Sequence, residues 1–191
     1  MKKMLILNGS PHSNGDTAYI IEKLKERINN KIEICELNAY KSNIKPCIDC
    51  RYCWKNEGCS INDDMKIIWD DDYDIIVVAS PVYMYNVTPP LFSIITRLNM
   101  KWCNKYFLKK EYNSKNKKGI LILTGGGSGK PDNAIDSAEI VFKILNAEFN
   151  INDNYIYSLN TNTIPAKDDK NLIELIDKTI ESLKYIMILK Q

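Results

Sequence analysis

The sequence lacks the long apolar runs that a membrane span or a secretion signal requires. Its first apolar run, residues 4–7, ends at once in Asn8, Gly9, Ser10 and Pro11, and no later stretch is long enough to cross a bilayer. It also lacks an excess of one charge, since 26 Lys and Arg residues face 24 Asp and Glu residues. We therefore expect a soluble, cytoplasmic protein that binds neither nucleic acid nor a membrane.

Two common nucleotide-binding signatures are also missing. The loop after the first apolar run has no Gly-x-Gly-x-x-Gly motif, so a dinucleotide pyrophosphate fits poorly there. The glycine-rich residues 124–131 are not a Walker A loop, because Thr124 replaces its first glycine and Pro131 replaces its Ser or Thr. Hydrolysis of a nucleoside triphosphate therefore has little support.

Short apolar runs indicate a parallel β-sheet in a single domain. The chain shows no internal repeat and no linker, and 191 residues suit one compact domain over residues 1–191. Continuous apolar runs too short for helices indicate buried strands, and two further segments are weaker candidates. These five segments are residues 4–7, 75–79 and 120–123, with 32–37 and 155–159 as the weaker pair.

Segments with a helical period alternate with these strands, at residues 17–28, 135–145 and 172–189. Pro89 and Pro90 mark the start of a further helix, because proline is tolerated in a first turn. The alternation predicts an α/β three-layer sandwich whose five-stranded parallel sheet has the order 2-1-3-4-5, the flavodoxin-like winding. A ligand then lies outside the carboxyl ends of strands 1 and 3. We read the Lys- and Asn-rich residues 104–118 as a solvated surface loop.

The loop after the first strand has the composition of a phosphate site. Small hydroxyl residues, glycine and the free amides of a helix N-terminus can together cradle a phosphate dianion. A carboxylate in the loop would repel that dianion unless it points away. An ordinary turn with a helix cap is the alternative. The candidate residues are Ser10, His12, Ser13, Asn14, Gly15, Asp16 and Thr17.

The loops after the third and fourth strands suit a flat ring system. The first is aromatic and apolar, and it can offer stacking surface as well as backbone donors and acceptors to an isoalloxazine. Alternatively, its tyrosines pack beneath the loop. The second is rich in glycine, which lets the backbone approach a flat ligand or leaves the loop mobile. The candidates are Pro81, Val82, Tyr83, Met84, Tyr85 and Asn86, followed by Thr124, Gly125, Gly126 and Gly129.

Four cysteines in the loop 46–60 form the most distinctive local feature. Cys47, Cys50, Cys53 and Cys59 have the spacing C-x2-C-x2-C-x5-C. Three neighbouring thiolates plus a fourth suit the corners of a [4Fe-4S] cube. Zinc fits less well, since structural zinc sites usually join two Cys-x-x-Cys elements across a longer loop, and reduced free thiols are the third alternative.

The remaining two cysteines are not expected to bind metal. Cys35 lies in an expected strand, and Cys103 lies near the end of the helix that Pro89 opens. Buried cysteine packs well among apolar side chains. We expect both to be core or surface thiols.

The three loops together resemble the NADPH-dependent FMN reductase family over roughly residues 1–149. The resemblance implies FMN, with its phosphate on the first loop and its ring against the other two. Two positions depart from the family pattern, namely His12, where the family often has Arg, and Asp16, where it often has Asn. The resemblance rests on residues 9–11 and 14–17, then 80–83, 89–97 and 124–126.

The cysteine motif resembles the iron-sulfur flavoprotein branch of that family. This resemblance implies that the four cysteines hold a [4Fe-4S] cluster that exchanges single electrons with the FMN of a neighbouring subunit. A homodimer or homotetramer is implied with it. A ferredoxin-like protein or a small molecule is the candidate electron partner, and NAD(P)H is the candidate reductant.

Three functions follow, and the leading one is an oxidoreductase that transfers electrons between FMN and a [4Fe-4S] cluster. It needs no catalytic side chain, because the cofactors carry the chemistry. An NAD(P)H-dependent FMN or quinone reductase without a cluster is the alternative. A zinc-stabilised binding module without redox activity is the third.

Overall fold

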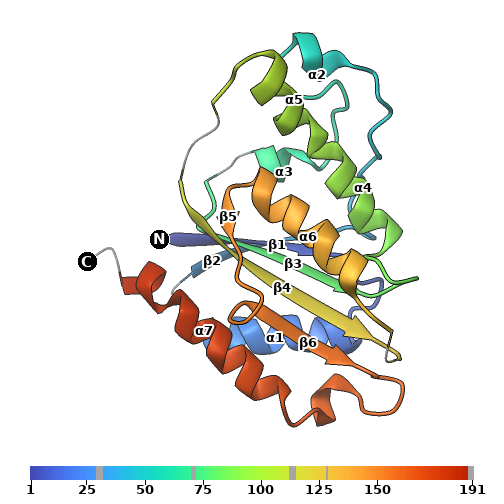
Figure 1. The fold of residues 1–191 in the computed structure, drawn as a ribbon, viewed down its shortest axis with the longest axis vertical. Coiled ribbons are helices and arrows are strands. Elements are labelled where there is room, and N and C mark those ends of the chain that lie inside the picture. The colour runs from blue at the N-terminus through green and yellow to red at the C-terminus, as the bar shows by residue number, and fades with distance from the viewer. Residues whose placement is uncertain (29–31, 70–71, 112–114, 128, 189–191) are drawn as a thin grey trace.

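A computed structural model describes residues 1–28, 32–69, 72–111, 115–127 and 129–188. A parallel sheet runs through the middle of the molecule, and helices cover both of its faces (Figure 1). The predicted three-layer α/β architecture is therefore confirmed. The strands are β1 (Lys2–Asn8), β2 (Ile32–Asn38), β3 (Ile75–Pro81), β4 (Lys117–Gly125), β5 (Ala147–Glu148) and β6 (Tyr155–Leu159).

The strand order confirms the predicted winding, with one difference at an edge. The strands run β2-β1-β3-β4, and both β5 and β6 then pair in parallel with β4. The predicted fifth strand at residues 155–159 is confirmed as β6, and the two-residue strand β5, which was not predicted, makes the sheet six-stranded instead of five-stranded. Between β5 and β6 the chain turns, and the Asn150 carbonyl accepts hydrogen bonds from the amides of Asp153 and Asn154.

Helices α1 (Asp16–Ile28) and α7 (Leu172–Ile188) cover one face of the sheet. The predicted helix at residues 17–28 is confirmed, and residue 189 lies outside the described residues. The other face carries α4, which Pro89 opens as expected, and α6. The elements on that side are α2 (Tyr52–Lys55), α3 (Lys66–Trp69), α4 (Pro89–Arg97), α5 (Asn99–Phe107) and α6 (Asp132–Ile144), and a 3-10 turn, η2 (Ala166–Asp168), precedes α7.

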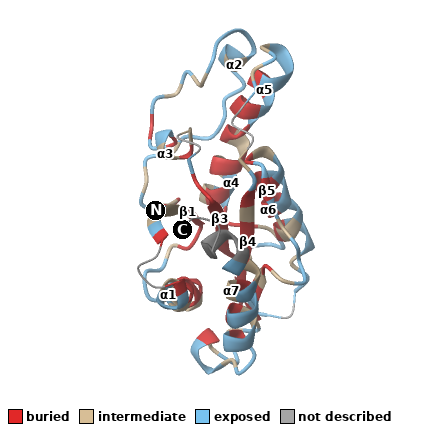
Figure 2. Cartoon of the chain, turned by 90° about the vertical axis from the view of Figure 1, so that its left-hand side faces the viewer, coloured by how far each residue is buried: buried red, intermediate tan, exposed pale blue. Residues whose placement is uncertain are grey.

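Alternate strand residues fill two separate cores, one on each face of the sheet. In β1, Met4 and Ile6 pack against α1 and α7, whereas Leu5 and Leu7 pack towards α4 and α6. All four side chains are fully buried, which explains why β1 reads as a continuous apolar run. Figure 2 shows the contrast between these buried layers and the exposed helix α2. No helix among the described residues is long and apolar enough to cross a membrane.

The expectation of a surface loop at residues 104–118 was wrong at both ends. Helix α5 continues to Phe107, and β4 already begins at Lys117. Asn104 and Lys117 are both buried, and the ammonium group of Lys117 donates to the Leu145 carbonyl at 3.0 Å. The high content of Lys and Asn suggested an exposed loop, but these two polar side chains are buried because backbone carbonyls accept their hydrogen bonds. Residues 112–114 lie outside the described residues.

Gly119 of β4 offers a test of the packing between sheet and helix. A Cβ at this position would lie 2.7 Å from the ring of Phe142 in α6. We expect Gly119→Ala to destabilise the protein by roughly 1–3 kcal/mol, because the ring must move within a filled core. Gly127→Ala is the matched control, since a Cβ there meets no described atom within 4 Å. Thermal unfolding should separate the two variants, and equal melting temperatures would contradict this view of the core.

Candidate functional site

The loops after β1, β3 and β4 are tied together at the carboxyl edge of the sheet. The Gly9 amide donates to the Ala79 carbonyl at 2.7 Å, and the Thr88 hydroxyl donates to the Gly9 carbonyl at 2.8 Å. The Val82 amide donates to the Thr124 carbonyl at 2.7 Å. The sequence therefore brings three distant loops to one place, as the winding predicted, although Thr88 was not foreseen as the link.

A fourth bond closes this arrangement. The hydroxyl groups of Thr17 and Thr124 lie 2.7 Å apart in the interior and share a hydrogen bond. Gly9 is needed for the close approach of these loops, because a Cβ there would lie 2.8 Å from Leu91 and 2.9 Å from the Thr88 hydroxyl. These contacts thus hold the first helix and the glycine-rich loop next to each other.

The first loop divides into inward and outward residues. Ser10 is buried, and its hydroxyl exchanges hydrogen bonds with the backbone of His12. The Thr17 hydroxyl is hydrogen-bonded to the hydroxyl of Thr124. His12, Ser13 and Asn14 are exposed. Their side chains are available to bind an anion. The first amides of α1 are available as well, because no carbonyl within the helix can accept their hydrogen bonds.

The Asp16 carboxylate, beside the candidate anion site, has a partner within the protein. Its carboxylate accepts a hydrogen bond from the amide of Ala166 in η2 at 2.8 Å. The repulsion that a carboxylate would cause next to a phosphate is reduced by this engagement. This partner could not be predicted from the sequence, since 150 residues separate Asp16 from Ala166.

The loop after β3 forms a tight turn that pushes aromatic side chains outward. Tyr83 and Asn86 exchange backbone hydrogen bonds of 2.8 and 3.0 Å around Met84 and Tyr85, whose φ angles are +48° and +67°. Met84 is 89% exposed and Tyr85 57%, so the tyrosines do not pack beneath the loop. Non-glycine residues in this region cost on the order of 1 kcal/mol or more each, and such strain concentrates at functional sites.

Asn86 anchors this turn instead of facing a ligand. Its side-chain carbonyl accepts the Val87 amide at 2.7 Å and the hydroxyl of Ser137 in α6 at 2.8 Å. Pro81 ends β3, and Val82 follows it at the sheet edge. The outward face of the loop therefore belongs to Tyr83, Met84 and Tyr85.

Neighbouring side chains leave little room for a Cβ at two glycines after β4. A Cβ on Gly125 would lie 3.1 Å from Leu159, and one on Gly126 would lie 2.7 Å from the amide of Asn162. The loop after β6 therefore supports the glycine loop, which the sequence did not indicate. Gly129 faces the ring of Tyr85, and an open cavity of about 420 Å³ lies there, lined by Tyr85, Gly129, Lys130, Asp132 and Asn133.

The cysteine segment is held to the protein by side chains of α4 and α5. Asn104, fully buried, donates to the carbonyls of Cys53 and Asn56 at 2.7 and 3.1 Å and accepts the Gly58 amide at 3.0 Å. At the start of the segment, the Cys47 amide donates to Thr96 at 3.3 Å. One asparagine thereby fixes the whole turn between the third and fourth cysteines.

A buried ion pair holds the base of the same segment. Arg97 and Asp63 lie with nitrogen and oxygen atoms 2.6 Å apart, and both side chains are 1% exposed. The guanidinium also donates to the carbonyls of Lys45 and Ile61 at 2.8 and 3.1 Å. Burial alone would raise the pKa of Asp63, but the hydrogen bonds from Arg97 and two backbone amides outweigh it and lower that pKa.

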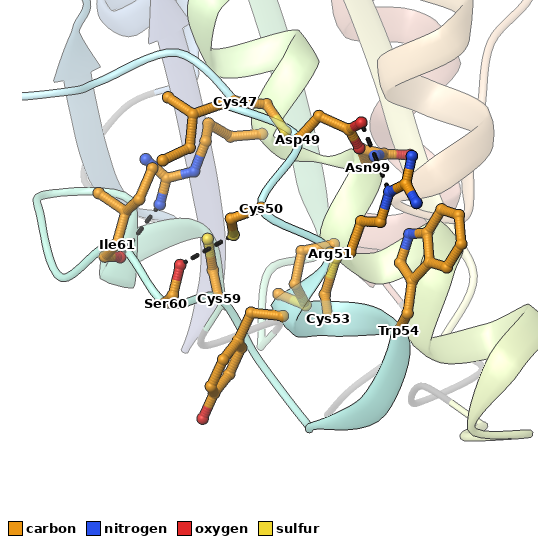
Figure 3. A pocket seen from close by; sticks show the side chains of 14 residues that line it. Cys47, Asp49, Cys50, Arg51, Cys53, Trp54, Cys59, Ser60, Ile61 and Asn99 are labelled. Atoms are coloured by element: carbon orange, nitrogen blue, oxygen red, sulfur yellow. Dashed lines mark hydrogen bonds and ion pairs between the residues drawn. The ribbon is translucent and has the colours of Figure 1, made fainter.

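All four motif cysteines line one cavity (Figure 3). Each carries a free thiol, and the cavity measures about 20 Å³, close to the space of one water molecule. Among the described residues, no three His, Cys, Asp or Glu side chains have the geometry of a metal site. The cysteines therefore share one cavity, but their sulfur atoms have not converged on a common point.

The backbone around Cys50 is arranged for a thiolate. The Ser60 hydroxyl lies 3.1 Å from its sulfur, and together with the Tyr52 amide it lowers the pKa of the Cys50 thiol. Asp49 and Arg51, on either side of Cys50, have φ angles of +50° and +57°. This strained turn directs amide groups at sulfur, which is what a metal-bound thiolate needs.

Cys103 lies closer to the segment than the sequence suggested. It is buried in α5, as expected for a core thiol, yet it interacts with Cys53. Burial and this neighbouring thiol raise the pKa of Cys53. Cys35, in β2, is half-buried and does not line the cavity.

The two candidate sites stand at different places in the molecule. The loops after β1, β3 and β4 lie at the carboxyl edge of the sheet, whereas α2 and α5 project outward beyond α3 and α4 on one side of the sheet (Figure 1). The candidate ligand site therefore lies on the sheet, and the candidate cysteine site lies on a separate projection formed by α2 and α5.

Comparison with known proteins identifies the family. The model of the NADPH-dependent FMN reductase family matches residues 2–158. The chain belongs to this family. Iron-sulfur flavoproteins are among its curated relatives, one from Methanosarcina thermophila with 26% identity over 99% of this chain and 97% of its own length. Another, from Archaeoglobus fulgidus, is 30% identical over 69% of this chain.

The matched region spans 58% and 54% of the lengths of two Archaeoglobus fulgidus relatives. Solved structures of low identity confirm the flavodoxin-like fold of this family member. RosB superposes with a TM-score of 0.71 at 18% identity, covering 98% of this chain and 79% of RosB. An NADH:FMN oxidoreductase superposes with a TM-score of 0.65 at 13% identity, covering 100% and 92%.

Removal of the Asn104 side chain should release the cysteine segment of this family member. Asn104→Ala leaves two carbonyls and one amide of the segment without their present partner, each lost hydrogen bond costing about 0.5–1.5 kcal/mol, while alanine favours the helix itself. We expect faster hydrogen exchange at the Gly58 amide and faster proteolysis between Cys53 and Gly58. Asn56→Ala is the control, because that exposed side chain bonds only locally to Tyr52. Equal exchange in both variants would show that Asn104 does not hold the segment.

Proposed function

We propose that this protein is an FMN-dependent oxidoreductase that transfers electrons between FMN and a [4Fe-4S] cluster. The observation that carries the proposal is the pairing of two sites in one chain. Three hydrogen-bonded loops meet at the carboxyl edge of a flavodoxin-like sheet, and four free cysteines line one cavity beyond it.

Residues of the first and second loops suit the two ends of FMN. The first turn of α1, with His12, Ser13 and Asn14, would hold the phosphate, because unpaired amides and exposed donors meet there. Tyr83 and Tyr85 would face the ring from the strained turn. FMN, when bound, supplies the two-electron and one-electron redox chemistry, and the protein supplies binding and orientation.

Cys47, Cys50, Cys53 and Cys59 would hold the cluster. Four free thiols, an amide-lined turn at Cys50 and relatives named iron-sulfur flavoproteins all support it. A cavity of about 20 Å³ cannot admit a cluster without rearrangement, so the exposed segment must open as the thiols turn inward. A reductase that uses NAD(P)H to reduce FMN or a quinone, without a cluster, is the second candidate, and the unconverged sulfur atoms favour it.

We further propose that the protein acts as a homodimer or homotetramer. The cysteine projection stands apart from the flavin loops of its own chain, so a second subunit is the natural electron acceptor for the cluster. An exposed aromatic cluster on α2 and α5 would be covered by that subunit. It comprises Trp54 stacked on Phe107 at 4.7 Å and Trp102 against Tyr106 at 4.4 Å. Sedimentation as a monomer at micromolar concentration would contradict this assembly.

NAD(P)H is the proposed reductant, in line with the family to which the chain belongs. A ferredoxin-like protein or a small molecule is the proposed electron partner. A cytoplasmic location is proposed with it, because thiolate ligands persist in a reducing compartment.

Anaerobic purification with assays of flavin, iron and sulfide tests the leading function. We expect one FMN and about four iron and four sulfide per chain, with absorbance near 400 nm that dithionite bleaches beyond the flavin bands. FMN without iron would favour the second candidate. Zinc without iron or flavin would instead support a zinc-stabilised binding module.

A pair of cysteine variants separates the two cofactors. Cys59→Ser should lose most of its iron and keep FMN, because it removes one thiolate from the cavity and leaves the three sheet-edge loops intact. Cys35→Ser, in β2, should keep both. Iron content and flavin fluorescence measure the two cofactors independently, and equal iron in both variants would remove Cys59 from the ligand set.

A further inference from the structure

Two asparagine–glycine pairs flank the loop after β1, and their surroundings differ. They are Asn8–Gly9 at the end of β1 and Asn14–Gly15 just before α1, and the sequence has no other such pair. Asparagine followed by glycine is the dipeptide most prone to deamidation, because glycine has no side chain to shield its own amide nitrogen from the asparagine side chain. The fold therefore decides which of the two pairs can react.

The first pair is held by buried hydrogen bonds. Asn8 is 5% exposed, and its side-chain nitrogen donates to the Glu36 carboxylate at 2.7 Å while its side-chain oxygen accepts the Ser10 amide at 2.8 Å. The amide nitrogen of Gly9, which would have to attack the Asn8 side chain, donates to the Ala79 carbonyl at 2.7 Å. Neither reacting group can turn towards the other without breaking these bonds, so Asn8 should keep its amide.

The second pair has no such restraint. Asn14 is exposed and Gly15 is half-buried. Within the part of the chain that the structure describes, neither the Asn14 side chain nor the Gly15 amide nitrogen has a hydrogen-bond partner. The Gly15 carbonyl accepts the Tyr19 amide at 2.9 Å, which ties the end of the loop to α1 and leaves both reacting groups unbonded.

We propose that Asn14 is a site of spontaneous deamidation, and that its conversion to aspartate or isoaspartate weakens the binding of the FMN phosphate. The first part stands on the structure alone, whereas the second rests on the proposed function. Hydroxide removes the proton of the Gly15 amide, and that nitrogen forms a bond to the side-chain carbonyl carbon of Asn14. The side-chain amide of Asn14 leaves as ammonia, and water opens the resulting succinimide ring. Overall, one water is consumed, one ammonia is released and no oxidant takes part.

The product adds a negative charge beside the proposed phosphate donors. Asn14 precedes the first turn of α1, whose amides have no carbonyl partner within the helix. A carboxylate there repels a phosphate dianion and competes with it for these amides. Asp16 differs, since its carboxylate already accepts the amide of Ala166 at 2.8 Å. Isoaspartate also lengthens the backbone by one methylene at the entry to α1.

Mass spectrometry with fragment ions that separate Asn8 from Asn14 tests the modification site. The purified protein is kept in mildly alkaline buffer, folded in one sample and in concentrated urea in the other. We expect the folded chain to convert Asn14 at least about tenfold faster than Asn8, because conversion of Asn8 requires local opening. In urea, both should convert at similar rates. A folded chain that converts both residues equally, or neither, would overturn the proposal.

Asn14→Asp tests the effect on flavin, because it installs one of the products directly. FMN and riboflavin are titrated against the flavin-free variant and the flavin-free unaltered chain, and binding is followed by flavin fluorescence. We expect the dissociation constant of FMN to rise about tenfold, while that of riboflavin, which lacks the phosphate, stays the same. Asn152→Asp is the matched control, since it adds the same charge at an exposed position in the turn between β5 and β6 and should change neither constant.

Two results of these titrations would overturn the effect on FMN. One is equal FMN affinity of Asn14→Asp and the unaltered chain, and the other is an equal loss of affinity for FMN and riboflavin, which would indicate a damaged loop instead of a repelled phosphate. Failure of the unaltered chain to bind FMN would refute the proposed function and this effect together. Mass spectrometry would still decide whether Asn14 is the deamidation site.

Discussion

The buried ion pair between Arg97 and Asp63 is the constraint on which the cysteine site depends. It closes the segment that leaves β2 and returns to α3, because Asp63 follows the last cysteine and Arg97 ends α4. Removal of one partner from such a pair typically costs about 3–5 kcal/mol, since the other charge is left buried.

Buried polar contacts also hold the loops at the carboxyl edge of the sheet, but there the groups are neutral. Thr17, Thr88 and Thr124 join three loops through hydroxyl and carbonyl groups that are buried below the ligand surface. Because these polar atoms are satisfied by the chain, the groups left for a ligand are the outward ones, namely the amides at the start of α1 and the rings of Tyr83 and Tyr85. The hydrogen-bonded framework is therefore separate from the candidate ligand-binding residues.

The sequence predicted what depends on periodicity and spacing, and missed what depends on single buried polar side chains. The continuous apolar runs at β1, β3 and β4 indicated a parallel sheet correctly, because strands buried on both faces need such runs. Asn104 and Arg97 were missed, since a helical Asn or Arg reads as a surface residue until its partners are known. The edge strand β6 was predicted with its observed bounds, whereas β5 was not predicted, because a two-residue strand is too short to give an apolar run.

Both candidate sites contain pairs of non-glycine residues with positive φ, Asp49 and Arg51 beside Cys50 and Met84 and Tyr85 in the aromatic turn. Such conformations persist only where the surrounding structure determines them. At the aromatic turn, Ser137 of α6 donates to Asn86, which closes the turn. In the cysteine segment, Asn104 of α5 instead bonds to the carbonyls of Cys53 and Asn56, which follow the strained residues. Helices on one face of the sheet thus contact both candidate sites.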